Sequence, residues 1–233
     1  QMIDSYDKID AVLERVSAIR EQCGKYFGIA IDFHGRVHKP MAKILAKKLE
    51  EFDPMFIEEP VLCENMEYFP EIMDFNFTAN VEKEFDEVFS KYDFKRLLKT
   101  GGVDIIQPDL SHAGGLTEVR KIASMAEAFD VALAPHCPLG PIALASCLNV
   151  DAVSYNAVIQ EQSIGIHYNV GKSVLDYVKN QEDFQFQNGF VDLPVKPGLG
   201  VEVNKDLVLQ ENQNPHHWKN PVWRHADGSI AEW

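Results

Sequence analysis

Carboxylate and imidazole side chains recur along this sequence at nearly regular intervals. Asp32 precedes Glu58 by 26 residues, Asp109 precedes His136 by 27 residues, and His136 precedes Glu161 by 25 residues. Carboxylate oxygens are good ligands for hard divalent cations such as Mg²⁺, and histidine transfers protons near neutral pH. Any one of these residues, taken alone, is more often a solvated or structural side chain. Their regular repetition therefore carries the prediction of a site that combines Mg²⁺ with acid–base chemistry.

Two histidines are expected to lie beside carboxylates in this site. His34 follows Asp32 by two residues, so on an extended strand the two side chains would lie on the same side. Asp109 and His136 are expected at neighbouring strand ends, where the carboxylate would fix the imidazole tautomer and raise its basicity. The sequence thus offers two histidines as candidates for proton transfer.

The hydrophobic pattern predicts alternating strands and helices that would position these residues. Helical spacing of apolar residues indicates helices over 6–22, 40–52 and 119–126, and another beginning at 141. Short apolar stretches, typical of strands buried on both faces, occur at residues 27–32, 55–60, 104–109, 131–136 and 152–158. Strands and helices in this order predict an α/β fold with a parallel sheet and crossover helices.

The spacing also predicts a barrel and a further strand within it. The 51 residues between Glu58 and Asp109 leave room for one more unit, with a site residue near Glu84. A (β/α) barrel has eight strands and carries its chemistry at their C-terminal ends. Because six strands are counted and the chain opens on a helix, we expect a partial TIM-like barrel that lacks its first strands. Residues 1–233 are expected to form this single incomplete domain, with an irregular tail from about 165 and a helix near 174–178.

The composition excludes some classes of partner. The chain has 36 Asp and Glu against 22 Lys and Arg, for a formal net charge of −14. This balance argues against nucleic-acid and anionic-membrane partners, because both need a basic face. The four cysteines form no CxxC pair, and no apolar run approaches the length of a membrane span, so a cytoplasmic protein is expected. The composition is compatible with a homo-oligomer but does not specify one.

Several stretches of the chain resemble the galactonate-dehydratase family of the enolase superfamily, in its mandelate racemase/muconate lactonizing enzyme group. The matching stretches are Asp32–Pro40, Ile57–Pro60, Gln107–Gly115, Pro135–Pro141, Trp223–His225 and Ala231–Trp233. The resemblance implies a capping domain ahead of a (β/α)₇β barrel with Mg²⁺ at the strand ends. It also implies a hydro-lyase that dehydrates the small-molecule acid sugar D-galactonate to 2-dehydro-3-deoxy-D-galactonate.

The resemblance implies a role for each of the recurring residues. Asp32 and Glu58 correspond to metal ligands, and His34 corresponds to the general acid. Asp109 and His136 correspond to the Asp–His dyad that acts as the base. Glu161 corresponds to an acid near the substrate carboxylate. Enolase-superfamily sites pair a Lys or His base with Mg²⁺.

The resemblance fails at the third metal ligand. The family has Gly-Glu-Arg there, which residues 76–89 lack. Counting forward from Glu58 puts this ligand at Glu84, whereas counting back from Phe89 puts it at Asp86. Apolar spacing at Phe85, Val88, Phe89 and Tyr92 also fits a helix, which would contain both acids, and the ligand would then be lost. An inactive barrel remnant with a binding role, and a dehydratase of another aldonate, therefore stay open as alternatives.

Overall fold

The computed structural model describes residues 5–72, 79–82, 89–165, 173–213, 222, 224 and 227–229. Within these ranges the strands form one five-stranded parallel sheet whose spatial order follows the order of the chain. The strands are β1 (Ala30–Asp32), β2 (Phe56–Glu58), β3 (Ala79–Glu82), β4 (Ile105–Gln107) and β5 (Ala132–Leu133). An isolated parallel bridge between Leu133 and Ala157 adds a further position beside β5. The predicted α/β fold with a parallel sheet is therefore confirmed.

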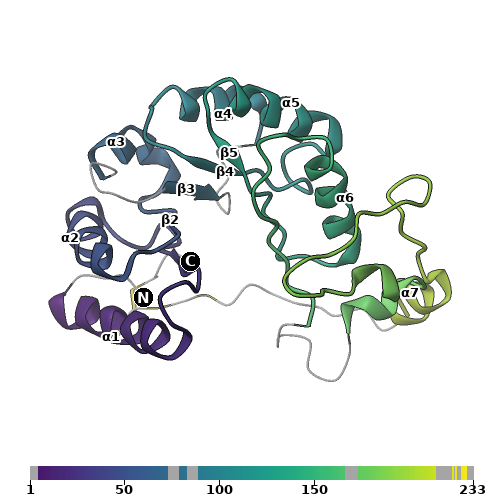
Figure 1. Cartoon of the computed structure of the whole chain (residues 1–233), viewed down its shortest axis with the longest axis horizontal. Coiled ribbons are helices and arrows are strands. Elements are labelled where there is room, and N and C mark those ends of the chain that lie inside the picture. Colours follow the sequence, from purple (N-terminus) through teal and green to yellow (C-terminus); the bar gives the residue numbers. More distant parts are fainter. Residues whose placement is uncertain are drawn as a thin grey trace.

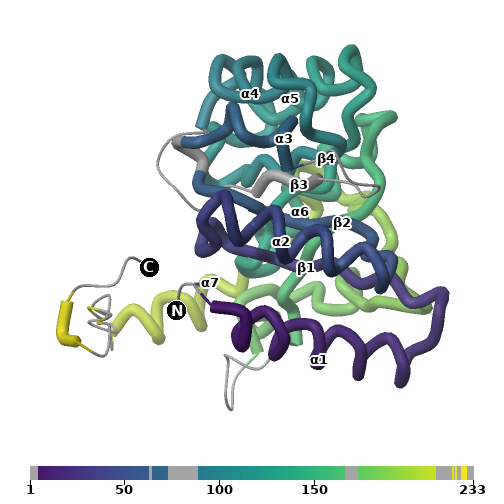
Figure 2. Tube along the Cα trace, turned by 90° about the vertical axis from the view of Figure 1, so that its left-hand side faces the viewer, coloured from purple at the N-terminus to yellow at the C-terminus, as the bar shows by residue number. Residues whose placement is uncertain are grey.

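Helices surround the outer side of this curved sheet, so that the strands lie within an arc of helices (Figure 1); Figure 2 shows the same arrangement turned by 90°. The α-helices are α1 (Tyr6–Cys23), α2 (Lys39–Leu49), α3 (Phe69–Ile72), α4 (Lys91–Leu98), α5 (Leu116–Glu127), α6 (Pro141–Asp151) and α7 (Lys205–Glu211). Short 3₁₀ helices span Glu50–Phe52, Cys63–Tyr68, Val174–Tyr177 and Gln181–Phe184. None of the helices in the described ranges has both the length and the apolar character needed to cross a membrane.

Local sequence signals explain where several helices begin. Pro40 lies in the first turn of α2, where its fixed φ and missing N–H cost nothing. At the start of α4, the Ser90 side chain and Asp93 form a reciprocal capping box that satisfies backbone donors. These signals determine where the crossover helices begin, and therefore where the loops that follow the strands end.

The core lies between the sheet and the helices. Ile57, Ile106 and Leu133 are fully buried on β2, β4 and β5. They pack in one cluster with helix residues that include Leu45 and Ile122. Burial of each such side chain contributes about 1.5–3 kcal/mol, which holds successive strands in a fixed register. That register determines which polar residues meet at the strand ends.

Two predicted elements differ from the structure, and the end of a third lies outside the described residues. The expected strand over 152–158 is reduced to the bridge at Ala157, because α6 and the turn after it extend to Val153. The tail element near 174–178 is a 3₁₀ helix, Val174–Tyr177, which Ser173 and Asp176 cap. The strand expected to end near Glu84 is β3, and its described part ends at Glu82.

Candidate active site

Asp32 and Glu58 end neighbouring strands and are paired in register. Glu58 is buried, and burial together with the charges of Asp32 and Glu161 raises its pKa to about 8. A hydrogen bond from the Gln107 side chain offsets part of this rise. Crowded carboxylates of this kind are destabilised by one another and stabilised by a cation. The donor set therefore fits a hard divalent metal ion.

His34 contacts Asp32 through a turn and not along an extended strand as predicted. The strand ends at Asp32, and His34 has a φ of 53°, so the extended strand expected from Asp32 through His34 is wrong. The turn nevertheless brings the side chains together, with His34 Nδ1 3.0 Å from Asp32 Oδ2. The backbone N–H of His34 also donates to Asp32 Oδ1 at 2.5 Å. Asp32 thus holds both the backbone and the imidazole of His34.

Glu59 joins this group, although the sequence analysis did not single it out. Its φ of 41° turns the chain directly after β2, and its buried side chain places Oε2 3.9 Å from His34 Nδ1. One ligand atom from each of Asp32, His34 and Glu59 lies within 4.8 Å of the others. Strand alternation would direct Glu59 away from Glu58. The only signal in the sequence was the Glu-Glu doublet before Pro60.

Asp109 and His136 form a buried pair at the ends of β4 and β5. His136 Nδ1 lies 2.9 Å from Asp109 Oδ2, and the side chains are 5% and 2% exposed. The backbone N–H of Ser111 donates to the other carboxylate oxygen of Asp109 at 2.6 Å. Because an ionised carboxylate only accepts hydrogen bonds, Nδ1 of His136 carries the hydrogen and Nε2 is left as the basic atom.

The basic nitrogen of His136 faces Glu161. Nε2 lies 3.9 Å from Glu161 Oε2, and the same oxygen accepts a 2.7 Å hydrogen bond from the backbone N–H of Cys137. Burial lowers the pKa of His136 to about 4, while the charge of Asp32 acts in the opposite direction and that of His34 in the same direction. An imidazole with this pKa is neutral at pH 7 and can accept a proton.

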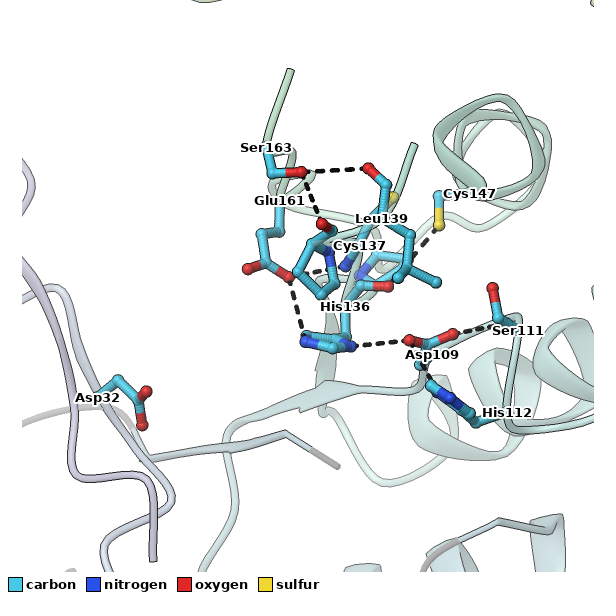
Figure 3. A network of polar contacts seen from close by, with 12 residues as sticks. Asp32, Asp109, Ser111, His112, His136, Cys137, Leu139, Cys147, Glu161 and Ser163 are labelled. Atoms are coloured by element: carbon cyan, nitrogen blue, oxygen red, sulfur yellow. Dashed lines mark hydrogen bonds and ion pairs between the residues drawn. The ribbon is translucent and has the colours of Figure 1, made fainter. Parts of the chain in front are cut away.

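The group around Asp32 and the group around His136 influence each other electrostatically. The charges of Asp32 and His34 affect the pKa of His136, and the charge of Glu161 affects that of Glu58. Figure 3 shows Asp32 facing the His136–Glu161 pair from the opposite side. Of the predicted site residues within the described ranges, all therefore gather at the C-terminal ends of the strands: Asp32, His34, Glu58, Asp109, His136 and Glu161.

The third metal ligand remains a prediction. Glu84 and Asp86 both lie outside the described residues. The backbone of Glu82 ends β3 and pairs in register with Gln107 on β4. On its other side, β3 pairs Asn80 in register with Glu58 of β2.

An apolar groove of about 680 Å³ begins at Leu110 and Ser111, directly after Asp109. It is lined by the starts of α5 and α6, by the 3₁₀ helix Val174–Tyr177 and by Val208 of α7. The titratable residues described above do not line it. Acid–base chemistry is therefore assigned to the strand ends and not to this groove.

Comparison with protein families gives one match over most of the chain. Residues 3–207 match the model of the enolase C-terminal domain-like family. D-galactonate dehydratases from two Xanthomonas campestris pv. campestris strains, B100 and 8004, are each 57% identical to the chain over 233 residues. The match covers all of this chain and 60% of each relative. The chain thus spans about three fifths of the length of these relatives.

Solved structures share the fold. An enolase from Agrobacterium radiobacter, described as a candidate galactarate dehydratase and bound to Na and L-malate, matches with a TM-score of 0.84 and 29% identity. The alignment covers 98% of this chain and 59% of that one. A mandelate racemase/muconate lactonizing enzyme from Jannaschia sp. CCS1 matches with a TM-score of 0.82 and 26% identity, over 94% of this chain and 53% of that one.

Proposed function

Because this chain belongs to the enolase C-terminal domain-like family, we propose that it is the barrel part of a Mg²⁺-dependent acid-sugar dehydratase. The proposed reaction converts D-galactonate to 2-dehydro-3-deoxy-D-galactonate and water. Relatives that are 57% identical carry the name D-galactonate dehydratase, and this supports galactonate as the substrate. The observation that carries the proposal is a buried, neutral His136, oriented by Asp109 and facing a cluster of carboxylates.

The first step would be removal of the C2 proton by His136. Nε2 is the unprotonated atom of this imidazole, and Asp109 stabilises the imidazolium that forms when it takes the proton. A proton next to a carboxylate is weakly acidic, so the developing negative charge needs stabilisation. A divalent cation bound at the strand ends would supply it as a Lewis acid on the substrate carboxylate.

The second step would be departure of the C3 hydroxyl with a proton from His34. Asp32 orients this imidazole through the 3.0 Å contact with Nδ1, and Nε2 would carry the proton that is transferred. The C2 proton goes to His136, the C3 oxygen leaves as water with the proton of His34, and the resulting enol becomes the 2-keto acid. Each such acid or base contributes about 10²- to 10⁴-fold to the rate.

The metal would be held by carboxylates at the ends of successive strands. Asp32 and Glu58 are the proposed ligands, and Glu84 is the proposed third. Oxygen ligands and room for water or substrate suit Mg²⁺. Glu59 lies close enough to contribute, since its carboxylate is within 4.8 Å of an Asp32 oxygen. Glu161 is proposed to contact the substrate beside His136.

Replacement of the matching segment of a Xanthomonas relative by this chain tests the proposal. The grafted protein should dehydrate D-galactonate with added Mg²⁺, and formation of the 2-keto-3-deoxy acid should be measured by mass spectrometry. The ungrafted relative is the positive control, and a graft with His136→Asn is the negative control. Activity on a different aldonate would correct the substrate. A folded, Mg²⁺-binding graft that converts no aldonate would favour a binding role.

A further inference from the structure

A second imidazole contacts the carboxylate that orients His136. His112 Nδ1 lies 3.0 Å from Asp109 Oδ2, the same oxygen that lies 2.9 Å from His136 Nδ1. Figure 3 shows the two rings meeting this carboxylate from different directions. The other oxygen of Asp109 is occupied by the backbone N–H of Ser111. One buried carboxylate oxygen is therefore divided between two histidines.

The turn after β4 places His112 there. The carbonyl of Asp109 accepts hydrogen bonds from the backbone N–H groups of His112 and Ala113, at 3.2 and 2.7 Å. This turn folds the chain back, so that the side chain three residues after Asp109 returns to its carboxylate. The His112 side chain is 52% exposed, whereas that of His136 is 5% exposed. His112 therefore connects solvent to a carboxylate that is otherwise buried.

We propose that His112 is a positioning residue that shares Asp109 Oδ2 with His136 and so limits the negative charge that Asp109 places on His136. An ionised carboxylate only accepts hydrogen bonds, so His136 presents Nδ1–H to this oxygen, and His112 Nδ1 makes a 3.0 Å polar contact with the same atom. Each imidazole draws charge from the oxygen, and in a buried site this effect is poorly screened. His112 then weakens the stabilisation of a protonated His136. The inference deepens the proposed role of His136 as the base.

Other charged groups also act on His136, and the test must keep them constant. They are Asp109 from β4, Glu161 beyond Ala157, and Asp32 with His34 from the end of β1. His112 is distinct among them because it acts through Asp109. A substitution of His112 leaves the other groups in place and removes little packing, because its side chain is exposed.

Two substitutions separate the polar contact between His112 and Asp109 from the bulk of the ring. His112→Phe keeps a ring but removes the donor. His112→Asn keeps a donor, because the Asn amide nitrogen is the same number of bonds from the backbone as Nδ1. His38→Phe is the matched control, since it removes another exposed imidazole, located before α2. Amide spectra of each variant establish that the fold is retained.

Nuclear magnetic resonance of this chain labelled with ¹⁵N at histidine measures the effect without any turnover. In His112→Phe, the Nδ1–H proton of His136 should move to lower field at neutral pH, because its hydrogen bond to Asp109 strengthens. The titration midpoint of His136 should rise by about half a unit to one unit. His112→Asn should stay near the wild-type values, and His38→Phe should equal them.

The outcomes distinguish this inference from the proposed function. An unchanged His136 resonance and midpoint in His112→Phe would overturn the inference, as would equal shifts in the Phe and Asn variants. If His112→Phe does not fold, His112→Leu provides the same loss of the donor. Absence of dehydratase activity in the grafted protein would contradict the proposed function but would not alter these signals.

Discussion

Asp32 and Glu58 face each other in register at the ends of β1 and β2, and the charge of Asp32 adds to burial in raising the pKa of Glu58 to about 8. This relationship makes Glu58 costly to ionise in the absence of a cation. Binding of a cation should therefore lower the pKa of Glu58, because the cation offsets the repulsion between the two carboxylates.

Glu58→Gln should stabilise the cation-free chain at about pH 8 and have little effect at about pH 5. In the unfolded chain Glu58 loses its proton near its ordinary pKa of 4.5, whereas the folded chain keeps it up to about 8. The folded state therefore binds more protons in this window, and its free energy of unfolding falls as pH rises through it. Urea unfolding in the presence of EDTA should give a difference of a few kcal/mol at about pH 8.

The exposed residue Glu127 at the end of α5 provides the control, as Glu127→Gln. Its free energy of unfolding should follow that of the wild type across the pH range. A stabilisation by Glu58→Gln that does not change with pH would contradict the raised pKa of Glu58, because a packing effect does not titrate.

Mg²⁺ should raise the melting temperature of the wild-type chain in proportion to the logarithm of its concentration, by mass action. Asp32→Asn should abolish most of this rise, because it removes one of the proposed ligands. Asp206→Asn, at an exposed position of α7, should leave the rise unchanged. Differential scanning fluorimetry, with NaCl at matched ionic strength, measures both effects. An equal response of the wild type and Asp32→Asn would show that Mg²⁺ binds elsewhere.

The two proposed proton-transfer residues should differ in how they affect exchange of the C2 hydrogen. In the grafted protein, His136→Asn should lower both dehydration and C2 exchange with D₂O by about 10²- to 10⁴-fold, because it removes the base. His34→Asn should lower dehydration by a similar factor and leave C2 exchange measurable, since proton abstraction is reversible without loss of the hydroxyl. Proton NMR of D-galactonate follows the exchange. Equal loss of exchange in both variants would mean that His34 positions the substrate or metal instead of acting as the acid.

Ile106→Ala should lower the free energy of unfolding by about 2–5 kcal/mol, because the fully buried side chain on β4 leaves a cavity between sheet and helices. Val153→Ala, at a position that is 55% exposed, should change it by less than about 0.5 kcal/mol. Urea denaturation compares the two variants with the wild type. Similar losses in both would indicate that the sheet is not packed as described.

The sequence by itself determined the order of the predicted strands and helices and the polar residues at the strand ends. Buried parallel strands are nearly continuous apolar stretches, and helices repeat with another period, so the two could be distinguished along the chain. The regular spacing from Asp32 to Glu161 placed each site residue at the same edge of the sheet, because parallel strands share their direction. The strand predicted over 152–158 was reduced to a bridge at Ala157, since α6 and its turn extend into that range.

Tertiary structure decided how the side chains meet within that edge. The positive φ values of His34 and Glu59 redirect both residues, and strand alternation cannot predict such turns. The partners of Asp109 depend on a turn that returns His112 to it and on a neighbouring strand that delivers His136. Burial, which shifts the pKa values of Glu58 and His136 in opposite directions, arises only when the sheet and helices are packed together. Spacing in the sequence thus identifies the site residues, whereas packing in the folded chain determines their pKa values.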